Sequence, residues 1–143
     1  MRTFYIFNIN KYFTYMYKKR PSRIYKILEE VYHVQGKDIV LSYRVFEQIA
    51  DTFNKNKLNE YIKYLSKDID GYHYKDGSHI ICNNYEYTKL NINNSNIKIK
   101  SNINYPYFLD MISKYKDSIF VCDFNNHDYF WLDKLTETSC QKT

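Results

Sequence analysis

The side chains with the clearest capacity for chemistry are two histidines and a cysteine that lie close together in the chain, His73, His79 and Cys82. Imidazole nitrogen and thiolate sulfur are ligands that zinc prefers, but structural zinc sites need four of them at short, regular spacings. No second pair of cysteine or histidine residues lies nearby in the sequence. We therefore expect surface histidines and a packed cysteine in this segment, and we predict no bound metal ion or other cofactor.

Asp123 and His127 are spaced so that they would form a hydrogen-bonded acid–base pair across a turn. No nucleophile accompanies them, because Cys122 points to the opposite face of its strand from Asp123 and no serine lies in a nucleophile-elbow pattern. The sequence has only three glycines, which excludes the glycine-rich loops that cradle phosphates. We expect Asp123 to hold the turn, His127 to be exposed and the protein not to be an enzyme. A small hydrolase is the less favoured alternative.

Aromatic side chains crowd a short segment near the N-terminus, which contains Tyr12, Phe13, Tyr15, Met16 and Tyr17. A helix of this length cannot bury all of them against one core. Phe13 and Tyr17 are four positions apart and are therefore neighbours on a helix surface. An exposed aromatic pair with basic neighbours is typical of a protein–protein hot spot. Two arrangements stay open: either this pair is exposed, or it faces the core and the other three lie outside.

The formal net charge of +5 comes from lysines that are spread along the chain with acidic residues between them. Nucleic-acid binders usually concentrate their positive charge, and we expect the densest cluster, residues 18–26, to be a solvated helix end and turn. In one alternative, the chain is a small basic nucleic-acid-binding module. Its lysines and tyrosines share a sheet face on which the tyrosines stack against bases. The members of that face are Tyr85, Tyr87, Lys89, Lys98 and Lys100. Because tyrosine is abundant throughout, we expect no direct contact with nucleic acid.

Length and composition restrict the class of protein. The chain has 143 residues, of which 44% are hydrophobic and 19% aromatic. These values exclude a disordered chain and permit one domain with its own core. The three cysteines are odd in number and widely spaced, as in proteins of a reducing compartment. No apolar run approaches the roughly 18 residues of a membrane span. We expect a cytoplasmic protein without a membrane partner.

Periodicity and turn signals predict the order of the elements. Helices are expected at residues 11–19, 22–34, 43–53, 57–67 and 106–116, with Asn10 and Ser22 as caps and Gly36 as a stop. Strands are expected at 3–9, 72–74, 78–82, 85–90, 96–100, 119–124 and 129–132, and residues 39–43 are expected to be a short strand or an extended link.

This order predicts an α+β fold. We expect a single domain over residues 1–132, in which helices pack against a mixed or antiparallel sheet, followed by a flexible polar tail at 133–143. The segments 3–9, 119–124 and 129–132 should share the sheet, since all three are apolar and rich in β-forming residues and a short turn joins the last two. Trp131 should be largely buried.

The two ends of the chain resemble the SirA family, the sporulation inhibitor of replication of endospore-forming bacteria. Residues 2–17 read RTFYIFNINKYFTYMY, which matches the family's tyrosine-rich strand and its helix with an exposed Phe and Tyr. Residues 107–132 match its closing helix, hydrophobic strand, D-F-N at 123–125 and aromatic-Trp-Leu strand at 130–132. The match between residues 32 and 102 consists of the order of elements and a short E-Q-I at 47–49.

The resemblance implies a non-enzymatic inhibitor of DNA replication initiation during sporulation. Members of the family bind the N-terminal domain of the replication initiator DnaA. Their interface residues fall on Phe13, Tyr17 and Gln48 of this sequence. The helical pattern independently places Gln48 on the polar face of its helix.

Overall fold

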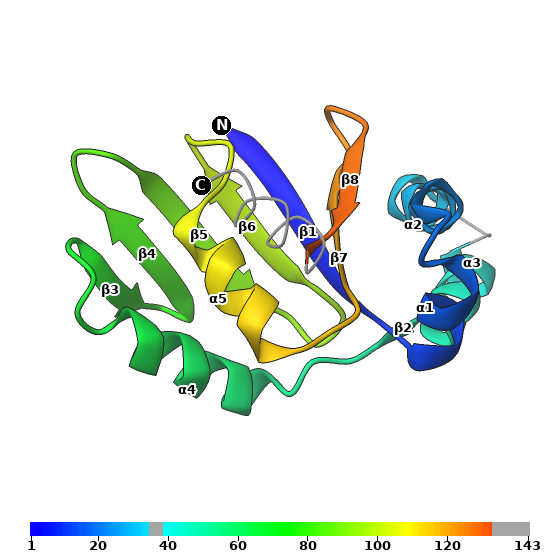
Figure 1. Ribbon diagram of the computed structural model, residues 1–143, viewed down its shortest axis with the longest axis horizontal. Coiled ribbons are helices and arrows are strands. Elements are labelled where there is room, and N and C mark those ends of the chain that lie inside the picture. Colours follow the sequence, from blue (N-terminus) through cyan, green and yellow to red (C-terminus); the bar gives the residue numbers. More distant parts are fainter. Residues whose placement is uncertain (35–38, 133–143) are drawn as a thin grey trace.

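The structure, a computed structural model, describes residues 1–34 and 39–132. Its helices are α1 (Lys11–Tyr17), α2 (Pro21–His33), α3 (Ile39–Ile49), α4 (Lys55–Ser66) and α5 (Tyr107–Tyr115). Its strands are β1 (Arg2–Ile9), β2 (Ala50–Asp51), β3 (Tyr72–Lys75), β4 (Ser78–Cys82), β5 (Tyr87–Ile92), β6 (Ile97–Ser101), β7 (Ile119–Asp123) and β8 (Asp128–Trp131) (Figure 1). The expected helix stop at Gly36 and the expected tail at 133–143 lie outside the described residues.

One antiparallel sheet contains all of these strands, in the order β3-β4-β5-β6-β1-β7-β8, with the short β2 paired to the end of β1. The segments expected to share a sheet do so: Tyr5 lies opposite Cys122 and Phe120 lies opposite Trp131. Trp131 is 2% exposed. The α+β class, the single domain and the meander from β3 to β6 are therefore confirmed.

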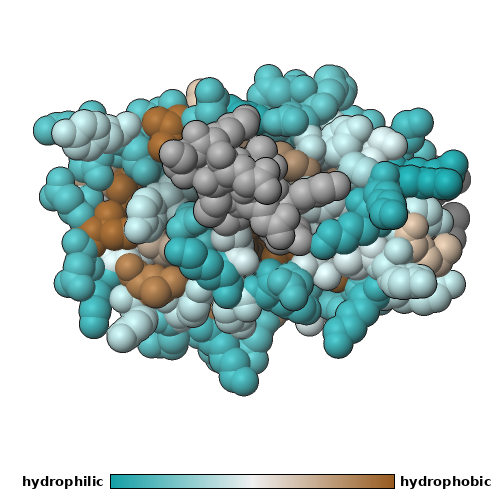
Figure 2. All heavy atoms as spheres, in the orientation of Figure 1, coloured by the Kyte–Doolittle hydropathy of each residue, from teal (hydrophilic) through white to brown (hydrophobic). Residues whose placement is uncertain are grey.

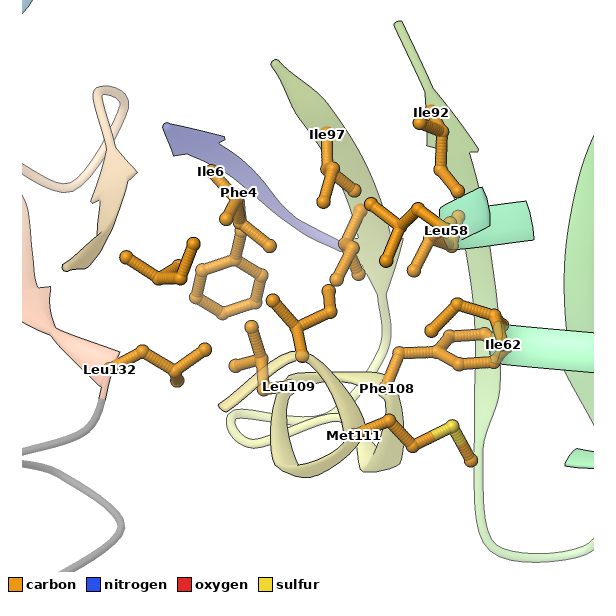
Figure 3. Packing of buried hydrophobic residues seen from close by; sticks show 14 of the residues in the cluster. Phe4, Ile6, Leu58, Ile62, Ile92, Ile97, Phe108, Leu109, Met111 and Leu132 are labelled. Carbon is orange, nitrogen blue, oxygen red and sulfur yellow. The ribbon is translucent and has the colours of Figure 1, made fainter. Parts of the chain in front are cut away.

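Helices α4 and α5 cover one face of the sheet. Alternate residues of β1 and β6, such as Phe4, Ile6 and Ile97, point from that face into a cluster completed by Phe108 and Leu109 of α5 (Figure 3). All five side chains are fully buried. Burial of a side chain of this size contributes about 1.5–3 kcal/mol, so this layer contributes substantially to stability.

The other face of the sheet is divided between two environments. A second apolar cluster lies over β1, β7 and β8, where Phe7, Phe120 and Trp131 pack against Ile24 and Leu28 of α2. Figure 1 shows α1, α2 and α3 gathered together at this end, apart from α4 and α5. No described helix packs on the same face over β3 to β6.

The outer surface on the side of the sheet that α4 and α5 cover is largely hydrophilic. The hydrophobic residues visible on it form small separate areas (Figure 2).

The third helix differs from the sequence prediction at both ends. It begins at Ile39, so the expected extended segment at 39–43 is wrong, and it ends at Ile49 instead of continuing to residue 53. A short apolar run is compatible with a helix or a strand by periodicity alone. At the other end, Asp51 and Ala50 leave the helix to pair with Asn8 and Ile9 of β1. This pairing between distant segments is invisible to local periodicity.

The start of the second helix also differs. Pro21 is its first residue and Arg20 its N-cap, so the expected cap at Ser22 is wrong. Proline suits the first helical position, because its fixed φ is helical and the N–H that it lacks would have no intrahelical partner there.

His79 lies in the core instead of on the surface, whereas Cys82 is exposed instead of packed; both expectations were wrong. The register of the sheet turns His79 toward α4 and α5, and Cys82 belongs to the opposite face. The His79 ring donates through Nε2 to Asn59 Oδ1 (2.8 Å) and accepts at Nδ1 from the Tyr72 hydroxyl (2.8 Å). Both bonds suit a neutral imidazole. Burial, with a contribution from the charge of Lys63, lowers the pKa of His79 to about 4.

We predict that His79 makes the fold sensitive to acid. Because its pKa is lower in the folded than in the unfolded state, the unfolded chain takes up the proton first, and stability falls as the pH decreases from about 6.5 toward 4. From pH 7.5 to pH 5 this contribution is roughly 2 kcal/mol. Urea unfolding at the two pH values should show a loss larger by this amount in the wild type than in His79→Gln, which cannot titrate. Equal losses in the two proteins would contradict the assignment.

Candidate functional site

Helix α1 has the reverse of the usual amphipathic arrangement. A surface helix normally turns its apolar residues to the core, but the one buried side chain of α1 is that of Thr14. Tyr12 is 68% exposed and Tyr15 90% exposed, and Met16 is also exposed. Exposed aromatic and methionine side chains are enriched in protein interfaces. The helix therefore presents an apolar surface that nothing in its own fold requires.

Phe13 and Tyr17 lie at the border between this surface and the core. Both are partly buried, and both pack against the cluster beneath α2. Their rings are stacked, with centroids 5.9 Å apart and an interplanar angle of 23°. The structure therefore combines the two arrangements that the sequence left open: the pair touches the core on one side and solvent on the other. Side chains held in this way lose little rotamer entropy on binding.

Asn10 joins this helix to the residue predicted to share its surface. The Asn10 Oδ1 atom accepts from the backbone N–H of Phe13 (2.9 Å), as the sequence predicted for a cap. Its Nδ2 atom donates to the backbone oxygen of Gln48, and its own N–H donates to Ile49 O (2.8 Å). The start of α1 is therefore bonded to the end of α3. The Gln48 side chain is exposed beside this junction.

The other end of α1 is held by the sheet. The indole Nε1 of Trp131 donates to the backbone oxygen of Lys18 (3.0 Å), just after the last residue of the helix. The Lys18 Nζ atom lies 5.7 Å from the centre of the Trp131 ring. A helix of seven residues is marginally stable by itself, so the bonds at its two ends hold its side chains in place. We call the surface formed by Tyr12, Phe13, Tyr15, Met16 and Tyr17 the aromatic surface.

A basic hollow adjoins the aromatic surface and was missed by the sequence analysis. It lies between α1 and α2, has a volume of about 450 Å³ and is lined by Tyr17, Ser22, Arg23, Lys26 and Ile27. Periodicity places Arg23 and Lys26 on the polar side of α2, but it does not show that α1 lies beside them. The surface therefore has an aromatic centre and a positively charged edge.

Asp123 and His127 have the arrangement expected from the sequence, not that of the acid–base pair that their spacing would allow. Asp123 holds the turn as predicted, because it accepts from the N–H and the side-chain amide of Asn126 and pairs with Arg2 at 2.8 Å. Burial alone would raise the pKa of Asp123, but the hydrogen bonds from Asn126 and Arg2 outweigh it and lower the pKa. His127 is exposed, as expected, and lies 3.3 Å from Glu29. A carboxylate held in this way is a weaker base than an ordinary aspartate.

The side chains of His73, His79 and Cys82 do not point toward a common site. His79 points into the core, whereas Cys82 and His73 belong to the opposite face of the sheet. Within residues 1–34 and 39–132, no group of three His, Cys, Asp or Glu side chains is arranged to hold a metal ion. In the same part of the chain, no helix has the length and apolar character needed to cross a bilayer.

Comparison with known proteins supports the resemblance at the two ends of the chain and extends it to the middle. The sequence model of a family described as "Sporulation inhibitor of replication protein SirA" matches residues 2–136. No curated protein matches the chain at a significant level.

We predict that Asn10 contributes more to stability than an ordinary helix cap. Asn10→Ala removes both the cap and the bond to Gln48, and should lower the free energy of unfolding by roughly 2 kcal/mol. Asn54→Ala is the matched control, since Asn54 Oδ1 caps α4 through Lys57 N (3.1 Å), and should cost about 1 kcal/mol. Asn10→Asp keeps the acceptor but not the donor and should be intermediate. Urea unfolding of the three variants checks this order, and equal losses for Asn10→Ala and Asn54→Ala would contradict it.

Proposed function

Because the chain belongs to the SirA family of sporulation inhibitors of replication, we propose that it binds the N-terminal domain of the replication initiator DnaA through the surface of α1. Phe13 and Tyr17 are the central contacts, and Gln48 contributes from the end of α3. The observation that supports this most strongly is the reversed amphipathicity of α1. In this helix a threonine is buried, Tyr12 and Tyr15 are exposed, and the Phe13–Tyr17 pair is only partly buried.

The arrangement is suited to a small, specific interface. Hot spots are enriched in aromatic residues, lie near the centre of an interface and are surrounded by residues that exclude water. Phe13 and Tyr17 are already ordered by stacking and by contact with the core. Tyr12 and Met16 flank them, and the hollow with Arg23 and Lys26 offers contacts to acidic groups of the partner.

The mechanism that we propose is occlusion. The N-terminal domain of DnaA makes protein contacts that are needed for assembly at the replication origin. A small domain seated on that surface removes these contacts without any chemical step, so the inhibitor needs neither a catalytic group nor a cofactor. This action places the protein in the cytoplasm, and the free thiols of Cys82 and Cys122 are compatible with a reducing compartment.

We predict that Phe13→Ala and Tyr17→Ala each weaken binding to the isolated N-terminal domain of DnaA by roughly 1–4 kcal/mol, the range for hot-spot residues. Gln48→Ala should cost less, because its side chain is exposed and polar. Isothermal titration calorimetry gives each affinity. Tyr107→Ala is the matched control and should bind normally. Tyr107 is an exposed tyrosine of α5, a helix that lies apart from α1 (Figure 1).

Thermal unfolding of the same variants separates binding from folding. Both aromatic variants should stay folded, because each side chain is only partly buried. Phe13→Leu retains an apolar group against the core and should still bind more weakly, because the ring is lost. Normal binding by both folded alanine variants would exclude this surface as the DnaA contact.

A further inference from the structure

The sheet gathers lysines that are scattered in the sequence onto one uncovered face. Directly paired residues of neighbouring strands point to the same side. Lys89 of β5 lies opposite Lys100 of β6, and two residues further along Asn91 lies opposite Lys98. Lys75 of β3 joins this second row through its pairing with Ser78 of β4, which lies opposite Asn91. This lysine face comprises Lys75, Lys89, Lys98 and Lys100.

The lysine face lacks the counter-charges that a merely structural role would favour. No strand residue that the structure describes on this side of β1 and β3 to β6 is acidic. No described carboxylate forms an ion pair with these lysines, although Lys98 Nζ lies 5.6 Å from the centre of the Tyr5 ring. Like charges directly opposite each other, as at Lys89 and Lys100, destabilise a sheet. The arrangement therefore opposes folding and suits an anionic ligand.

The centre of the face is concave. A hollow of about 160 Å³ is lined by Lys89, Asn91, Lys98 and Lys100. The side-chain amide of Asn91 donates to the Ser78 hydroxyl (2.7 Å), and this hydrogen bond fixes its orientation in the hollow. Lys98 and Lys100 are two residues apart on one strand, which separates them by about 7 Å. Repeated positive charges at this spacing match successive phosphates of an extended strand better than one compact anion.

Aromatic rings lie on the same side of the sheet as the lysines. Tyr87, which is 40% exposed, is two residues before Lys89, and the exposed His73 shares a row with Lys89 through Ile80. Unpaired bases stack on such rings, whereas the bases of a duplex are already stacked on each other. We propose that this face binds single-stranded nucleic acid, with the lysines on its phosphates and Tyr87 against a base. The sequence favoured no nucleic-acid contact. The strand register supports the alternative instead, because it places the tyrosine and three lysines of that alternative on one face and adds Lys75.

The test is binding of the full chain to a fluorescent oligothymidylate of about 16 nucleotides, measured by anisotropy from about 50 to 200 mM salt. The triple variant Lys89→Gln, Lys98→Gln, Lys100→Gln should bind at least about tenfold more weakly at the lowest salt. The slope of log affinity against log salt should become shallower by about 2, since each phosphate contact with a single strand contributes about 0.7. Thermal unfolding should show no loss of stability, because like-charge repulsion is removed.

The matched control is Lys55→Gln, Lys57→Gln, Lys116→Gln, which removes the same charge from exposed positions elsewhere and should change affinity little. An equal loss in both triple variants would mean that only net charge matters and would overturn the proposal. Equal affinity for a duplex of the same sequence, or equally strong competition by polyglutamate, would also overturn it, the latter in favour of an acidic protein partner.

Two further measurements complete the test. Tyr87→Ala should weaken oligonucleotide binding severalfold and Tyr87→Phe should not, because stacking needs the ring and not the hydroxyl; equal effects of the two would exclude stacking. The lysine variant should bind the N-terminal domain of DnaA with unchanged affinity, since α1 lies at the other end of the sheet (Figure 1). This separates failure of the nucleic-acid proposal from failure of the proposed function.

Discussion

The side-chain amide of Asn10 joins parts of the chain that are 38 positions apart. One of its atoms caps α1 and the other holds the last turn of α3, so the same residue sets where the first helix starts and what lies beside it. The opposite end of α1 is bonded to Trp131, so these bonds, together with the partial burial of Phe13 and Tyr17, hold the helix in place. Tyr12 and Tyr15 are exposed, and Phe13 and Tyr17 keep one side open to solvent. The surface that we propose as the DnaA contact therefore depends on the bonds at the two ends of α1.

The two faces of the sheet explain how so small a domain combines stability with exposed surfaces that do not stabilise its fold. One face carries the main core beneath α4 and α5, whose fully buried residues include Phe4, Phe108 and Leu109. The other is covered by α1, α2 and α3 only over β1, β7 and β8. Because the main core lies on the first face, the uncovered part of the second tolerates opposed lysines whose repulsion disfavours folding. The proposed protein and nucleic-acid contacts are thus carried by separate parts of the fold.

Much of the fold could be predicted from the sequence, because alternating β-rich segments and turn residues specify strands locally. The features that were missed depend on contacts between distant segments. Periodicity could not show that Ala50 and Asp51 leave a helix to pair with β1, or that His79 faces the core while Cys82 does not. For the site, the four-residue spacing of Phe13 and Tyr17 predicts that they are neighbours. The bonds from Asn10 and Trp131 at the two ends of α1 determine which side of the helix faces inward. The spacing of apolar residues in the sequence therefore could not predict the burial of Thr14.

The most direct test of the central claim is amide hydrogen exchange of the chain, alone and saturated with the N-terminal domain of DnaA. We expect slower exchange in α1, in the last turn of α3 and at the start of α2, where the aromatic surface meets the basic hollow. Exchange in β3 to β6 and in α4 should be unchanged. Protection confined to α4, α5 or the lysine face, with α1 exchanging as it does in the free protein, would contradict the claim.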